Sequence, residues 1–145
     1  MMSPPLSAPH LLVVLALLLP AANLRAELLV VMGAHSTLST LTLNQAKDLF
    51  LGRITCLPNG EAAAPLDQAD GSSLREAFYL KVTRLSTAQA KAHWAKLYFT
   101  GRGIPPKEGA NGSEIKQLLN RIPASISYIE KADFDNTVKV LLSVP

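Results

Sequence analysis

The chain has 145 residues, with 14 Lys and Arg against 11 Asp and Glu, which gives a formal net charge of +3. The positive charge is not gathered in a run, and only 6% of the residues are aromatic, so the composition argues against a nucleic-acid-binding protein. The single cysteine excludes an intramolecular disulfide. A mildly basic domain of this kind suits small anions or acidic cell-surface partners.

The amino-terminal end has the pattern of an export signal. Residues 11–19 are apolar without interruption, and Pro20 and several small residues follow. This run is too short for a membrane span, which needs about 20 apolar residues, but it fits the core of a signal peptide. We expect cleavage after Ala26, with Ala22 as the alternative, and no lipid anchor because no cysteine lies near the junction. Residues 1–26 are then a signal peptide, and residues 27–145 form one soluble periplasmic domain with a net charge of about +2.

The first part of that domain alternates between strand and helix patterns. Residues 27–32 are a short β-branched apolar run, which predicts a buried strand. Thr42-x-x-Gln45 is a capping box that opens a helix over residues 43–51. Residues 62–66 predict a weak second strand before a Gly-Ser-Ser turn.

The rest of the chain predicts three helices and two closing strands. Residues 99–109 form a long loop rich in Gly and Pro, close to the length of about twelve residues above which loops are usually functional or flexible. In chain order, the elements are a helix over 73–83, a helix opened by the capping box Ser86-x-x-Gln89 and running to about Tyr98, a helix over 113–121, and strands over 124–129 and 137–142.

This order of elements predicts one α/β domain with a mixed sheet flanked by helices. We expect residues 28–31, 126–129 and 138–142 to lie in one sheet. The core residues that we expect, because of their large apolar area, are Phe50, Phe78, Trp94 and Leu97.

The turn Asp70-Gly71-Ser72-Ser73 carries most of the functional information. The spacing Ser73-x-x-Glu76 predicts a capping box with Ser73 as the N-cap. A helix start leaves free backbone N–H groups and a positive dipole end, which together with a glycine and two hydroxyls suit a tetrahedral or carboxylate anion. The alternative interpretation is an ordinary N-cap that binds nothing.

Two arginines are candidates for the cation of such a site. Arg75 lies in the first helical turn, where a positive charge is unfavourable unless it meets an acid or a ligand. The alternative for Arg75 is a surface ion pair with Asp70 or Glu76. Arg102 lies between two glycines in the long loop, a suitable place for a ligand contact, and the alternative is a solvated loop charge.

No catalytic or metal-binding constellation is present in the sequence. Asp67 and Asp70 lack a companion base or nucleophile, so we expect them to form turns. His35 and His93 are isolated, without metal-ligand spacing, and we expect structural or solvated roles. For Cys56, a buried thiol and a thiol available for intermolecular pairing both remain open. We expect no enzyme activity, no metal and no cofactor.

Three segments, in order, carry a resemblance to a known family. Residues 41–55 (LTLNQAKDLFLGRIT) are similar to the family's Ls…IFlGkit segment, residues 70–73 (DGSS) to its DGSGT turn, and residues 123–129 (PASISYI) to its pgaIGYv strand. The family is that of the periplasmic phosphate-binding proteins serving ABC importers, within the type II periplasmic-binding superfamily. Residues 99–106 (FTGRGIPP) resemble a segment of its short single-lobe members. The resemblance covers residues 28–142 and implies a single lobe of that fold.

The resemblance implies a solute-binding protein of phosphate transport, acting with a membrane transporter or sensor. Gln68 stands where the family has an anion-clamping arginine, Leu74 replaces a hydroxyl, and we expect a single lobe without the opposing one. A neutral glutamine cannot replace a bidentate cation, so we expect weak binding of phosphate or completion of the cleft by a partner or a second copy. The alternative function is an envelope interaction or assembly module without a ligand. The residues expected to bind the anion are Gly71, Ser72, Ser73, Arg75 and Arg102.

Overall fold

The structure is a computed structural model that describes residues 2–5 and 27–145. Residues 6–26, which carry the apolar run and both expected cleavage sites, lie outside the described residues, so the signal peptide remains a prediction. None of the helices in the described part of the chain has the length and apolar content needed to cross a bilayer.

The order of the elements agrees with the sequence analysis, and most boundaries differ by only a few residues. The sequence analysis missed two short elements, a three-residue strand and a 3-10 turn. The helix predicted over residues 73–83 is α-helical only in its first part and ends as a π-helix. The elements are β1 (Leu28–Gly33), α1 (Leu43–Phe50), β2 (Ala64–Gln68), α2 (Ser73–Phe78), the π turn (Tyr79–Thr83), α3 (Thr87–Phe99), β3 (Lys107–Gly109), α4 (Gly112–Arg121), β4 (Ser125–Glu130), the 3-10 turn (Lys131–Asp133) and β5 (Val138–Val144).

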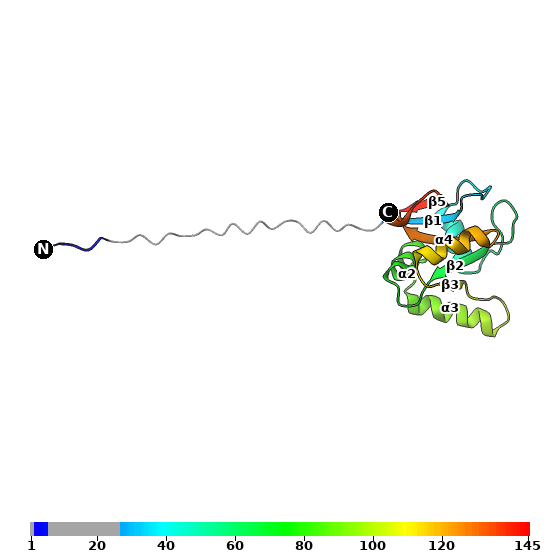
Figure 1. The fold of residues 1–145 in the computed structure, drawn as a ribbon. Coiled ribbons are helices and arrows are strands. Elements are labelled where there is room, and N and C mark those ends of the chain that lie inside the picture. Colours follow the sequence, from blue (N-terminus) through cyan, green and yellow to red (C-terminus); the bar gives the residue numbers. More distant parts are fainter. Residues whose placement is uncertain (1, 6–26) are drawn as a thin grey trace.

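The strands form one five-stranded sheet in the order β3-β2-β4-β1-β5, as expected for the three strands predicted to share it. Strand β2 runs parallel to β3 and β4, whereas β1 pairs antiparallel with β4 and β5, so the sheet is mixed. Figure 1 shows α4 lying across the sheet and α3 beside its β3 edge. The predicted fold class is confirmed.

The alternation of β1 explains why both faces of the sheet are covered. Leu28, Val30 and Met32 pack into one apolar cluster with α1, α2 and the π turn. Leu29 and Val31 point the other way and pack against α4. Side chains alternate across a strand, so a wholly apolar β1 must be buried on both sides.

The predicted core residues are confirmed with one exception. Phe50, Phe78 and Trp94 are buried, and the Trp94 indole N–H donates to the carbonyl of Phe50 at 3.1 Å. Leu97 is only partly buried, so its assignment to the core was wrong. The reason is the position of α3, which buries only Ala90 and Trp94 fully and leaves its last turn in solvent.

Two of the three predicted capping boxes are present, those of α1 and α3. The third is wrong. Ser72 is the N-cap of α2, and its hydroxyl accepts the backbone N–H of Arg75 at 3.3 Å, whereas Ser73 is already helical and Glu76 makes no reciprocal bond. Gly71 has a φ of +82°, which turns the chain one residue earlier than the Ser-x-x-Glu spacing indicates.

Candidate functional site

The site is built at the carboxyl end of β2. Asp67 and Gln68 are the last two residues of this strand, and both are buried. The turn-forming role predicted for Asp67 is therefore wrong. Strand β2 continues past its predicted end because β3 pairs with it, placing Asp67 opposite Glu108 and Gln68 opposite Gly109.

The Asp67 carboxylate is held by hydrogen bonds inside the protein. Tyr79 donates its hydroxyl to Oδ2 at 2.6 Å, Tyr128 donates to Oδ1, and the backbone N–H of Gln68 donates to Oδ1 at 3.0 Å. Burial raises the pKa of Asp67, and the two phenols and Arg75 oppose that rise. Burial and the adjacent Asp67 charge raise the pKa of both tyrosines, so both stay protonated and donate.

Arg75 points into the protein and meets this network. Its Nη1 donates to the carbonyl of Gln68 at 3.0 Å and to Oε1 of Glu108 at 2.7 Å. Its Nε lies 3.6 Å from Asp67 Oδ2 and is buried without a hydrogen-bond partner. The guanidinium also lies over the Tyr79 ring, 5.9 Å from its centroid.

The alternative of a surface pair between Arg75 and Asp70 or Glu76 is thus wrong. Burial disfavours the charged form of Arg75, but the bond to Glu108 and the nearby Asp67 charge outweigh it and raise the pKa of Arg75. Asp70 instead binds Lys91 of α3, which lowers the pKa of the Asp70 carboxyl.

The other residues of the turn lie at or near the surface, just before the helix that carries Arg75. Gly71 and Ser73 are exposed, and Ser72 is half-buried with its hydroxyl engaged in the helix cap. Among the described residues, the hydroxyl of Ser73 has no hydrogen-bond partner, so the turn presents this hydroxyl at the start of the helix that carries Arg75.

The structure separates Arg75 from Arg102. Arg75 lines a hollow of about 320 Å³ whose walls are Asp67, Lys91, Trp94, Ala95, Tyr98, Phe99, Pro105, Pro106 and Glu108. Arg102 lines a second, more apolar hollow of about 350 Å³ on the other side of Trp94 and the two prolines, among residues that include Gly52, Ile104 and Lys107. The predicted turn residues Gly71, Ser72 and Ser73 line neither hollow, so the five predicted site residues are not brought together.

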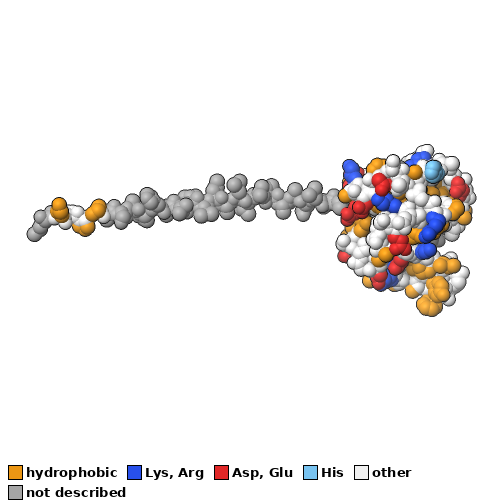
Figure 2. Space-filling model, in the orientation of Figure 1, with side chains coloured by type: hydrophobic (Ala, Val, Ile, Leu, Met, Phe, Trp, Pro, Cys, Tyr) orange, Lys and Arg blue, Asp and Glu red, His pale blue; other side chains and the backbone are white. Residues whose placement is uncertain are grey.

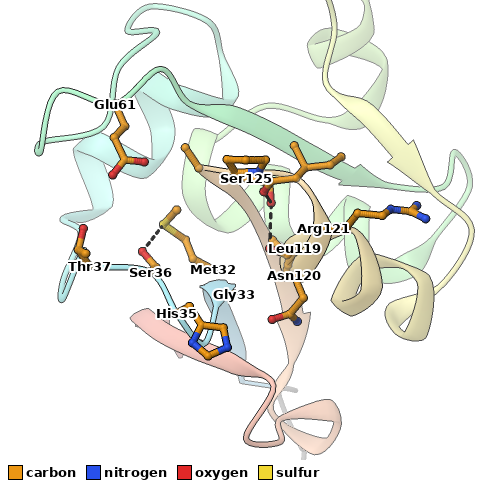
Figure 3. A pocket seen from close by; sticks show the side chains of 13 residues that line it. Met32, Gly33, His35, Ser36, Thr37, Glu61, Leu119, Asn120, Arg121 and Ser125 are labelled. Atoms are coloured by element: carbon orange, nitrogen blue, oxygen red, sulfur yellow. Dashed lines mark hydrogen bonds between the residues drawn. The ribbon is translucent and has the colours of Figure 1, made fainter.

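A third hollow, of about 270 Å³, is shown in Figure 3 and lies at the opposite end of the sheet. It is bounded by Ser125 at the start of β4, which pairs with the start of β2. In Figure 3 the side chain of Arg121 extends away from His35 and Glu61. Ligands of open α/β sheets bind at the carboxyl ends of parallel strands, which favours the Asp67 end over this one.

The remaining candidates have simpler roles. His93 places Nε2 at 2.6 Å from the carbonyl of Leu51, which makes it structural. His35 is exposed, and the thiol of Cys56 is free and exposed, which resolves the alternatives for that residue. Within residues 2–5 and 27–145, no three His, Cys, Asp or Glu side chains are placed to hold a metal ion.

Comparison with known proteins gives matches among solved structures. No family model and no curated protein matches the sequence. A protein from Clostridium perfringens, described as a phosphate ABC transporter substrate-binding protein with bound phosphate, superposes with a TM-score of 0.64 at 22% identity, over 80% of this chain and 45% of that one. The chain has the fold of a single lobe of a phosphate-binding protein.

Two further structures agree with this single-lobe fold. An ABC-type phosphate transport receptor from Vibrio cholerae gives a TM-score of 0.63 at 19% identity, and PstS from Borrelia burgdorferi gives 0.59 at 12%. Each comparison covers 80% of this chain, and this chain spans less than half the length of each of those proteins. The resemblance carried by residues 41–55, 70–73 and 123–129 therefore pointed to the correct fold.

Glu108 is the residue of this site that the sequence analysis missed. It belongs to β3, a Lys-Glu-Gly segment with no apolar pattern to mark it as a strand. Its role depends on the pairing of β3 with β2, which no local signal reveals.

Proposed function

We propose that this chain belongs to an exported solute-binding protein and binds a small oxyanion, most favourably phosphate, at the carboxyl end of β2. The observation that carries the proposal is the guanidinium of Arg75, which the Gln68 carbonyl and Glu108 hold at the carboxyl end of β2, on the helix that follows the turn formed by residues 70–73. Binding rather than catalysis is proposed, because the described residues offer a cation and donors without a nucleophile and base pair.

Arg75 supplies the charge that Gln68 lacks. Its Nη1 lies 3.0 Å from the Gln68 carbonyl, so the guanidinium occupies the neighbourhood of the residue that replaces the family's arginine. Its Nε–H is buried without a hydrogen-bond partner among the described residues, a state that costs free energy. The backbone N–H of Ser73, at the start of the same helix, is a further donor.

Glu108 is the internal competitor for an anion. Its carboxylate accepts a hydrogen bond from Nη1 of Arg75 at 2.7 Å, yet the Glu108 side chain is 50% exposed and can move into solvent. An incoming anion must displace this carboxylate and also face the Asp67 charge. We therefore expect a low affinity, with a dissociation constant near the millimolar range, because a few hydrogen bonds must offset the translational and rotational entropy that the anion loses on binding. A membrane transporter, a sensor or a second copy that completes the cleft would raise this affinity.

The test is titration with inorganic phosphate followed by amide NMR. Glu108→Gln removes the competing charge and should strengthen binding by about fivefold to tenfold, equivalent to about 1 to 1.4 kcal/mol. Glu76→Gln, which removes one negative charge from an exposed position of α2, the helix that carries Arg75, is the control and should change affinity less than twofold. The shifts should centre on residues 70–76 and weaken in a Ser72→Ala/Ser73→Ala variant.

An absence of shifts at high phosphate in both the wild type and Glu108→Gln, with the fold intact, would overturn the proposal. The interaction-module function would then take its place. An equal gain in phosphate affinity in Glu76→Gln and Glu108→Gln would show a general charge effect. Arg75 would then not be a ligand of the anion.

A further inference from the structure

One segment of the domain carries Lys and Arg without any acidic residue. Residues 87–107 contain four Lys and Arg and no Asp or Glu. The chain from Glu27 onward carries thirteen Lys and Arg, so the rest of it has nine against eleven Asp and Glu. This segment is therefore basic, and the rest of the domain is slightly acidic.

Three of these four cations form no ion pair with the residues that the structure describes. Lys91 pairs with Asp70. Lys96, Arg102 and Lys107 are exposed, and across the residues that the structure describes their side chains form no ion pair. The carboxylate nearest to them in sequence, Glu108, is bound to Arg75. The three charges are thus available to an external partner.

The same segment exposes large apolar side chains. Phe99 is 84% exposed, Ile104 81% and Tyr98 58%. The rings of Tyr98 and Phe99 contact each other edge to face, with centroids 5.6 Å apart. In Figure 2, hydrophobic side chains gather on a protrusion where α3 ends in Figure 1. We call these three residues, with Lys96, Arg102 and Lys107, the α3 tip.

The backbone builds the α3 tip as a projection. Helix α3 ends at Phe99, and Gly101, with a φ of +69°, turns the chain back toward the sheet. Pro105 and Pro106 restrict the returning segment. Phe99 and Ile104 therefore stand on the two sides of one turn, with basic side chains before, between and after them in the sequence.

We propose that the α3 tip docks on a membrane surface that carries anionic phospholipids. Exposed aromatic and aliphatic side chains framed by Lys and Arg are suited to the headgroup boundary, where the apolar groups insert and the cations meet phosphates. Protein interfaces, in contrast, are depleted of lysine. An anionic surface repels the slightly acidic remainder of the domain, which orients the molecule with the end of α3 toward the membrane. This inference does not depend on the proposed anion site.

The test is co-sedimentation with vesicles of phosphatidylcholine alone and of phosphatidylcholine mixed with phosphatidylglycerol. The protein is recovered from the periplasm, and its amino-terminus is first determined by mass spectrometry. We expect binding to the mixed vesicles that falls with added salt. Since each cation near an anionic surface contributes about a fivefold gain, the triple variant Lys96→Gln/Arg102→Gln/Lys107→Gln should lose about a hundredfold.

Apolar variants separate insertion from simple charge attraction. Phe99→Ser/Ile104→Ser should weaken binding to the mixed vesicles by about tenfold or more. Leu80→Ser/Phe134→Ser is the matched control, because these two side chains are also exposed, at 56% and 49%, but lie outside the α3 tip. Circular dichroism and thermal melting verify that every variant is folded.

Several results would overturn the proposal. They are no binding to mixed vesicles, equal binding to both kinds of vesicle, or equal losses in the two apolar variants. A concentration-dependent dimer that Phe99→Ser abolishes, without lipid binding, would assign the tip to a second copy of the chain instead.

Discussion

Replacement of Tyr128 by phenylalanine isolates the hydrogen bond that holds the buried Asp67 carboxylate. The Tyr128 hydroxyl donates to Oδ1 of Asp67, and it also lies 3.3 Å from the backbone N–H of Gln68. The ring is fully buried and stacks on Phe78 with centroids 3.8 Å apart. Phenylalanine preserves that stack, so the substitution removes the hydroxyl alone.

The expected loss follows from the charge of the acceptor. A hydrogen bond to an ionised group contributes about 1.5 to 3 kcal/mol, so we expect the free energy of unfolding of Tyr128→Phe to fall by about 2 kcal/mol. For a domain of this size that corresponds to a melting temperature lower by roughly 8 °C. The loss should shrink in acid, once Asp67 is protonated, because the acceptor is then neutral.

The measurement is urea unfolding followed by circular dichroism near neutral pH and in acid. Tyr98→Phe is the control, because Tyr98 is exposed and its hydroxyl has no partner among the described residues, and it should change stability by less than about 0.5 kcal/mol. A double-mutant cycle with Asp67→Asn should give a coupling of about 1 kcal/mol or more. A loss below about 0.5 kcal/mol in Tyr128→Phe, or a loss independent of pH, would refute the reasoning.

Three further predictions rest on separate features. Gly52→Ala should destabilise by about 2 to 4 kcal/mol in thermal unfolding, because φ is +69° and the new Cβ would lie 2.6 Å from Trp94 Cη2. Burial raises the pKa of Asp67, so the folded state holds this proton to higher pH than the unfolded chain. The stability that protonation contributes is full below about pH 3.9 and is lost as pH rises through the folded pKa. Asp67→Asn should therefore flatten this decline of stability with pH, measured by urea unfolding. Mass spectrometry of the exported protein should show cleavage after Ala26, and an uncleaved chain would contradict the export signal.

The sequence predicted correctly those helix starts that depend only on residues a few positions apart. The capping boxes at Thr42 and Ser86 each need only a hydroxyl and a glutamine three residues later, and both are present. The turn before α2 was misjudged by one residue, because the positive φ of Gly71 moved the cap to Ser72. The partial exposure of Leu97 depends on where α3 lies against the sheet, which helical periodicity cannot show.

By itself, the sequence determined the α/β class, the order of the predicted elements, the single sheet and the resemblance to phosphate-binding proteins. These features follow from periodicity, capping and motif order, which act over a few residues at a time. Only the tertiary structure decided that Arg75 is buried against Asp67 and Glu108, since those contacts join residues from three elements through the pairing of β2 with β3. It also separated Arg102 from Arg75, because Trp94 and two prolines lie between their hollows. Side-chain spacing along a chain carries no information about which strand edges meet, and the candidate site is formed where two such edges meet.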